Sequence, residues 1–71
     1  MLRVENVRSV DGNLNAVLDI QVSETSDLPS AGSTVCGYTI VSGSIAQIIQ
    51  EGKFVTLDND GNWYDEDGNE V

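Results

Sequence analysis

The stretch NLNAVLDIQV, residues 13–22, alternates apolar and mostly polar side chains over ten positions. The apolar set consists of Leu14, Ala16, Leu18, Ile20 and Val22. The opposite set consists of Asn13, Asn15, Val17, Asp19 and Gln21. Because successive side chains of a strand point to opposite faces, this period of two predicts a half-buried β-strand.

The preceding run, LRVENVRSV at 2–10, is rich in valine but alternates less cleanly. Asp11-Gly12 lies between the two apolar runs, and such a pair tolerates the positive φ angles of a type I′ turn. Two β-rich runs joined in this way are typical of a hairpin. The sequence therefore predicts a first hairpin over 1–22 with its turn at Asp11-Gly12.

The segment SETSDLPSAGST at 23–34 contains the only proline of the chain and six serine or threonine residues. This composition predicts a connecting loop. The loop is long for a small domain, so we expect a short helical turn or a contact surface within it. Neither half of the chain is large enough to fold alone, and residues 1–71 are expected to form a single small domain.

Beyond the loop, residues 35–71 alternate short β-rich runs with turn-forming residues. Turns are expected at 42–44, 51–52, 60–61 and 67–68. Strands are expected near 35–41, 45–50, 53–58 and 62–65. This spacing predicts a β-meander with an acidic, turn-rich C-terminus. The fold class expected for the whole chain is all-β or mostly β, as a small antiparallel meander, sandwich-like or barrel-like domain of about five or six strands.

A short helix at 45–51 is the alternative to the second of these strands. Ser44 and Gln47 fit a capping box, and Gly52 fits the position that follows a helix. Three isoleucines in this run also fit helical spacing. Short isoleucine-rich runs are ambiguous by pattern alone, and we favour the strand.

The charge of the chain limits its partners. Of its 71 residues, 12 are acidic and 3 are basic, and the net charge is −9. Nucleic acids and anionic membrane surfaces would repel such a chain, so we expect it to bind neither.

The single cysteine, Cys36, cannot close a disulfide within the chain, which argues against a disulfide-stapled secreted domain. We expect Cys36 to be a small apolar side chain inside a strand, in a reducing compartment. The N-terminal run MLRVENVRSV lacks the apolar core of a signal peptide, and synthesis in the cytosol is expected.

Catalytic chemistry finds no support in the residue types. With no histidine, neither a Ser-His nor a Cys-His nucleophile can be assembled, and zinc would lack its usual nitrogen ligands. The glycines are too dispersed for a phosphate-binding loop. The sequence therefore predicts a protein that is not an enzyme and holds no cofactor.

The acidic C-terminal run DNDGNWYDEDGNEV, residues 58–71, raises the question of a calcium site. An EF-hand loop needs ligands at positions 1, 3, 5 and 12 and a glycine at position 6. Placing Gly61 at position 6 puts Thr56 at position 1, and placing Gly68 there puts Trp63 at position 1 and runs out of chain. We therefore expect DNDGN and DEDGN to be reverse turns, with an irregular calcium site as the alternative.

The aromatic residues are the candidates for an interaction surface. Trp63 and Tyr64 are adjacent, so in a strand their side chains project to opposite faces. We favour a core position for Trp63 and leave that of Tyr64 open. An exposed aromatic ring can anchor a partner, and the candidate interaction residues are Trp63, Tyr64 and Phe54.

Several short motifs together resemble a known family. They are DLP at 27–29, GYTI at 37–40, GSIA at 43–46, EGKF at 51–54 and DGNWY at 60–64. In this order, over residues 27–64, they resemble the hairpin-rich β-module of small structural proteins from the virions of tailed phages and prophages of Gram-positive bacteria. That family includes capsid decoration proteins and head fibres.

The resemblance implies a structural component of a bacteriophage particle, most simply a capsid decoration or accessory protein that acts by surface binding and assembly. Its partners would be capsid or tail subunits, with a homo-oligomer left open, and its location would be the virion after synthesis in the host cytoplasm. Two other classes stay open from the residues. One is a carbohydrate or cell-surface binding module that uses Trp63. The other is a small acidic regulatory or inhibitor protein whose binding to a basic partner is weakened by salt.

Overall fold

Seven β-strands and one 3-10 turn make up the fold, and no α-helix is present. The computed structural model describes residues 1–71. The elements are β1 (Leu2–Val10), β2 (Asn15–Val22), η1 (Thr25–Asp27), β3 (Thr34–Val35), β4 (Tyr38–Ile40), β5 (Ile45–Ile48), β6 (Lys53–Leu57) and β7 (Trp63–Asp65). The prediction of a mostly β domain is confirmed. The chain forms no helix of the length and hydrophobicity that a membrane span requires.

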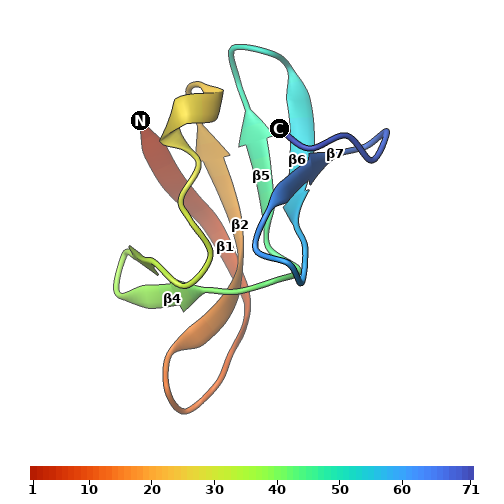
Figure 1. Cartoon of the computed structure of the whole chain (residues 1–71). Helices are drawn as coiled ribbons and strands as arrows, with labels where there is room; N and C mark the ends of the chain where they lie inside the picture. The colour runs from red at the N-terminus through yellow and green to blue at the C-terminus, as the bar shows by residue number, and fades with distance from the viewer.

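Strand β2 lies at the centre of the sheet and pairs with three other strands. It pairs antiparallel with β1 along one edge, and parallel with both β4 and β5 along the other. The path of the sheet is β3-β4-β2-β5-β6-β7, with β1 beside β2 (Figure 1). The sheet is therefore open and mixed rather than wholly antiparallel.

The long loop after β2 explains the parallel pairing. Two parallel neighbours need a crossover connection of a dozen or more residues between them. In Figure 1 the chain leaves the end of β2, passes through η1 and returns to β4, near the start of β2. Residues 23–34 thus supply the crossover, and η1 confirms the expected short helical turn within them.

The parallel edge of β2 contains an insertion. Ala16 pairs with Ile40 and Asp19 pairs with Ile45, so β2 advances three residues where its partner advances five. The two extra residues fall between β4 and β5, where Gly43 takes a positive φ of 94°. Only glycine adopts such a backbone conformation without strain.

Ser44 repairs the gap that this insertion leaves in the backbone ladder. Its hydroxyl accepts a hydrogen bond from the Leu18 N–H at 3.0 Å and donates one to the Val41 carbonyl at 2.7 Å. Its side chain is fully buried, with 0% exposure. On the other side, the Gly43 N–H donates to the Leu57 carbonyl at 2.8 Å, and the Leu57 N–H donates to the Ser44 carbonyl at 2.9 Å. The insertion is therefore held from both β2 and β6.

Strand β1 is irregular as well. Its register against β2 shifts twice, once between Val4 and Asn6 and once between Val7 and Ser9. These two bulges account for the poor alternation of the sequence over 2–10. Bulges also make an edge strand a poor template for pairing with another chain. The long outer edge of β1 is thereby protected.

The buried face of β2 forms the centre of the core. Its alternating residues Ala16, Leu18, Ile20 and Val22 are buried, as predicted, whereas Leu14 is 53% exposed. The single core cluster has eleven members: Ala16, Leu18, Ile20, Val22, Val35, Ile40, Ala46, Ile48, Val55, Leu57 and Trp63.

The crossover loop covers part of this core. Leu28 packs against the buried cluster, and the Trp63 Nε1–H donates to the Pro29 carbonyl at 2.8 Å. The indole thus fixes the loop to β7. Residues 23–34 serve as a contact surface inside the domain, in addition to making the crossover.

The run 45–51 is a strand followed by a turn, and the helical alternative is wrong. Ala46 and Ile48 are buried while Ile45 and Gln47 are half-buried, which is the period of two. Gly52 closes the turn with a positive φ of 65°. The segment forms a strand because Ala46 and Ile48 then complete the core beside β2.

The prediction for Cys36 is wrong, because its thiol is exposed rather than buried in a strand. Val35 pairs with Tyr38, so the chain must reverse within the two residues between them. Cys36 and Gly37 have φ values of 50° and 88°, the positive pair of a type I′ turn. The expected strand at 35–41 is accordingly divided into β3 and β4.

The first hairpin is present, but its turn differs from the one expected at Asp11-Gly12. The Asp11 N–H donates to the Asn15 carbonyl at 3.0 Å, and the Leu14 N–H donates to the Asp11 carbonyl at 3.1 Å. Gly12 is not among the residues with positive φ, whereas Leu14 has a φ of 65°. Three residues, 12–14, therefore lie between the paired Asp11 and Asn15, and the left-handed position of this loop is occupied by leucine.

The two acidic turns near the C-terminus repeat this hydrogen-bond pattern, and their prediction as reverse turns is confirmed. Asp58 and Asp65 pair through their N–H groups with Asn62 and Asn69, both at 2.9 Å. Gly61 and Gly68 occupy the left-handed position, with φ values of 87° and 83°. The leucine of the first hairpin thus stands where the other two loops use glycine.

Replacing Leu14 tests this assignment. Leu14→Gly and Leu14→Ala remove the same contacts but differ at the backbone, because alanine retains the strain of a left-handed conformation and glycine does not. We expect the glycine variant to be the more stable of the two by about 1 kcal/mol in urea unfolding. An alanine variant of equal or greater stability would contradict the assignment.

Candidate functional site

The side of the sheet opposite the buried cluster is called the outer face. Residues that stand directly opposite one another in paired strands share a face. Gln21 faces Gln47, Gln47 faces Phe54, and Thr56 faces both Ile45 and Tyr64. The outer face includes Arg3, Glu5, Asn6, Arg8, Ser9, Val17, Asp19, Gln21, Ile45, Gln47, Phe54, Thr56 and Tyr64.

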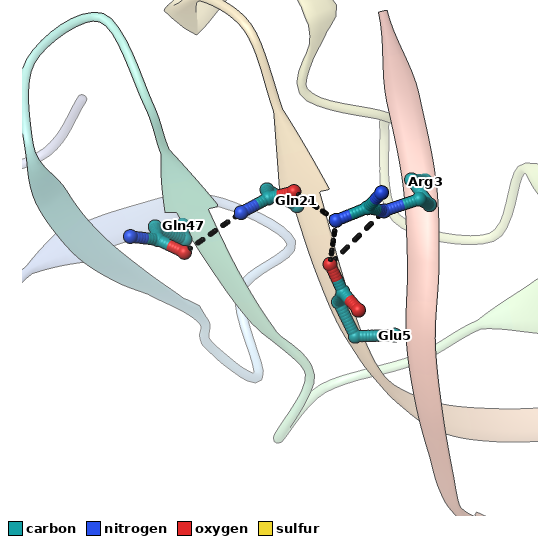
Figure 2. A network of polar contacts seen from close by, with 4 residues as sticks. All are labelled: Arg3, Glu5, Gln21 and Gln47. Atoms are coloured by element: carbon teal, nitrogen blue, oxygen red, sulfur yellow. Dashed lines mark hydrogen bonds and ion pairs between the residues drawn. The ribbon is translucent and has the colours of Figure 1, made fainter.

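A row of polar contacts crosses this face from β1 to β5 (Figure 2). The Arg3 Nη2 donates to Glu5 Oε1 at 2.7 Å and to Gln21 Oε1 at 2.8 Å. The Gln21 Nε2 then donates to Gln47 Oε1 at 3.1 Å. The row joins three strands and places a carboxylate beside the guanidinium group of Arg3.

A second guanidinium group, that of Arg8, spans β2. Its Nε lies 2.9 Å from Asp19 Oδ1 on β2. Its Nη2 donates to the carbonyl of Gly43, which lies beside the edge of β2 that faces away from β1. Arg8 stands at a bulge of β1, and Gly43 stands in the insertion between β4 and β5. One side chain therefore connects the irregular segments on the two sides of β2. The side chains of Arg8 and Asp19 are both more than a third exposed. Solvent screening therefore limits the contribution of this ion pair to the stability of the fold to about 0.2–1 kcal/mol.

All three basic side chains of the protein are paired with carboxylates of the same chain. The ion pairs are Arg3–Glu5, Arg8–Asp19 and Lys53–Glu51. The nine other carboxylates belong to Asp11, Glu24, Asp27, Asp58, Asp60, Asp65, Glu66, Asp67 and Glu70. These residues lie in the loops and turns, or at the end of β7. The charged side chains of the outer face, Arg3, Glu5, Arg8 and Asp19, therefore balance one another, while the excess carboxylates lie in the loops and turns, and that of Asp60 reaches the hydroxyl of Tyr64 at the β7 edge of this face.

Phe54 is the large apolar side chain exposed on the outer face, at 47%. It stands opposite Gln47 and two residues from Thr56, whose cross-strand neighbour is Tyr64. Diagonal neighbours of this kind are about 7–8 Å apart, which aromatic side chains can span. Phe54 and Tyr64 are thus the two aromatic residues that the neutral face presents.

Tyr64 is oriented by an aspartate of the preceding turn. Its hydroxyl donates to Asp60 Oδ2 at 2.7 Å. This hydrogen bond raises the pKa of Tyr64 above its ordinary value of 10.0, because loss of the proton would place two negative charges together. The same contact holds the pKa of Asp60 below 3.8.

Trp63 belongs to the core, as predicted. It is 7% exposed, and its indole N–H is bound to the Pro29 carbonyl. Its neighbour Tyr64 projects to the opposite face, as expected for adjacent strand residues. Of the three aromatic candidates, Tyr64 and Phe54 therefore lie together on the outer face and Trp63 lies beneath them.

The aspartates of the C-terminal turns bind their own backbone. Asp60 Oδ1 accepts from the Asn62 N–H at 3.0 Å, and Asp65 Oδ1 accepts from the N–H groups of Asp67 and Asn69 at 3.0 and 2.9 Å. No group of three or more histidine, cysteine, aspartate or glutamate side chains is placed to hold a metal ion. No pocket is found between the side chains.

Part of the outer face could be read from the sequence. The alternation over 13–22 placed Asp19 and Gln21 on the polar side of a strand, and Phe54 was a candidate by its residue type. Arg8 was missed because the bulges of β1 hide its position. Gln47 was missed because the register of its strand depends on the insertion before it.

Comparisons with protein-family models, with curated proteins and with solved structures find no match to this chain. The likeness to phage structural proteins over residues 27–64 therefore stays a prediction.

Replacing Asp60 by asparagine tests the contact with Tyr64. The neutral amide no longer opposes loss of the phenolic proton, so we expect the pKa of Tyr64 to fall toward 10.0 in Asp60→Asn. Absorbance of the tyrosinate ion during an alkaline titration measures this shift, and Tyr64→Phe identifies which signal belongs to Tyr64. An unchanged pKa would contradict the contact.

The contact also has a defined pH window. The raised pKa of Tyr64 means that its contribution to stability is present below pH 10.0 and is lost as pH rises through the folded-state value. The lowered pKa of Asp60 means that its contribution is present above pH 3.8 and is lost as pH falls through the folded-state value. The difference in melting temperature between the unmodified chain and Asp60→Asn should therefore shrink at both extremes.

Proposed function

We propose that this chain is a non-enzymatic structural component of a phage particle, and that it decorates the capsid by burying its outer face against protein neighbours. The observation that carries the proposal is the half-exposed Phe54, which lies on a neutral sheet face beside the amide of Gln47. Exposed aromatic rings in an uncharged setting are typical anchors of protein interfaces, whose centres are depleted in charge. The resemblance of the motifs over residues 27–64 to phage structural proteins is the reason for placing this contact surface in a virion.

Contact through a face fits this sheet better than contact through an edge. The two bulges of β1 interrupt the row of N–H and carbonyl groups that an added strand would need. Along β7, the Val71 N–H donates to the Trp63 carbonyl at 2.9 Å, so the last residues cover that edge. The outer face has no such cover, and Arg3 and Arg8 already have their carboxylate partners.

The acidic turns have a supporting role in this proposal. The charge of −9 lies mainly around the neutral face, where it keeps free subunits soluble before assembly. A partner that touches the outer face avoids most of this charge. Burying the face also adds stability to a small domain whose own core has eleven buried apolar residues.

Mass spectrometry of purified particles tests the proposal. Particles from cells that encode the chain should contain it in many copies, in a fixed ratio to the capsid subunit. Phe54→Thr should reduce occupancy about tenfold or more, because loss of an aromatic anchor costs about 2 kcal/mol. Val10→Thr is the matched control, since Val10 is similarly exposed at 48% but lies near the tip of the first hairpin. Particles without the chain, or equal losses with both variants, would contradict the proposal.

A further inference from the structure

We infer that the outer face packs against the outer face of a second copy, so that the unit that assembles is a dimer of two stacked sheets. The inference rests on the proposed function, in that it takes the outer face as the contact surface, and it names the partner on that face. Stacked sheets in proteins pack about 10 Å apart with their strands within about 30° of one another.

Charge favours a second copy on this face. The guanidinium groups of Arg3 and Arg8 each have a carboxylate partner within the chain. Neither group therefore needs a negatively charged group from another molecule. An identical face brings an equal set of satisfied ion pairs, and its one carboxylate without a basic partner, that of Asp60, lies at the β7 edge and is bound to the hydroxyl of Tyr64. A basic partner would instead be drawn toward the acidic turns, because the excess carboxylates lie there.

The two amide groups of the face can form hydrogen bonds with the same groups of a second copy. Gln21 and Gln47 carry amides, and each amide has both donor and acceptor atoms. A twofold axis places the same surface on both sides of a dimer interface, so groups that both donate and accept suit such an interface. Phe54 and Tyr64 would supply the apolar contact beside this amide row.

The size of the molecule also suits a dimer. The two longest dimensions of its backbone, 34 and 24 Å, bound the broadest side of the molecule at about 800 Å². Stable specific interfaces bury about 800 Å² from each partner. The broadest side of the molecule is therefore comparable in size to what one partner of a stable dimer buries, whereas the narrow sides are smaller.

Salt dependence separates this dimer from binding to a basic partner. Two chains of net charge −9 repel through their acidic turns, and salt screens that repulsion. Dimerisation should therefore strengthen as salt is raised. An interface between the acidic turns and a basic partner would weaken under the same change.

Sedimentation equilibrium of the full chain tests the inference. Between about 10 µM and 1 mM protein, the dimer fraction should rise with concentration, and it should be higher in 500 mM than in 20 mM sodium chloride. Phe54→Thr should raise the dissociation constant about tenfold or more, whereas Val10→Thr should leave it unchanged. Neither substitution alters charge, so the repulsion is the same in all three proteins. Circular dichroism confirms that each variant is folded.

A chain that stays monomeric up to 1 mM at both salt concentrations would overturn the inference. So would a dimer that Phe54→Thr leaves intact, or one that Val10→Thr weakens equally. If the chain is monomeric while Phe54→Thr still lowers occupancy on particles, the proposed function stands and the second copy is replaced by a capsid subunit. If the dimer forms and the chain is absent from particles, the inference stands without the proposed function.

Discussion

The buried hydroxyl of Ser44 is the contact on which the arrangement of this sheet depends. The segment from β4 to β5, which pairs with β2, contains two extra residues, and they interrupt the parallel ladder beside Leu18. A buried N–H without an acceptor costs about 1–3 kcal/mol, which is a large share of the few kcal/mol that stabilise a small domain. By accepting from Leu18 and donating to Val41, one serine satisfies both sides of the gap, and β4 and β5 can both line the same edge of β2.

This repair also determines where the outer face lies. Once β5 is in register with β2, Gln47 stands beside Gln21, and β6 then brings Phe54 next to Gln47. The Arg8 side chain adds a second connection between the irregular segments on the two edges of β2. The result is a sheet with a buried side completed by the crossover loop and a neutral side that is left uncovered. The position of the proposed contact surface therefore follows from how the core is built.

The sequence predicted the elements better than their connections. Period-two alternation identified β2 and its buried residues, and turn residues located the acidic reversals near Gly61 and Gly68, because both features are local. The parallel pairing was not predictable in this way, since it depends on where a loop of a dozen residues returns the chain. Cys36 was misplaced because nothing local in VCGY shows that Val35 and Tyr38 must pair. The outer face was found only in part, because the bulges of β1 conceal the position of Arg8.

Hydrogen exchange at the Leu18 amide, compared between Ser44→Ala and Ser42→Ala, tests the account most directly. Ser42 lies in the same insertion but is exposed, so its loss should cost less than about 0.5 kcal/mol. Ser44→Ala should lower the free energy of unfolding by about 2–3 kcal/mol and reduce protection most strongly at Leu18, whose amide loses the hydroxyl acceptor. If the two variants are equally stable and Leu18 stays protected in both, the hydroxyl of Ser44 is not what holds the parallel edge together.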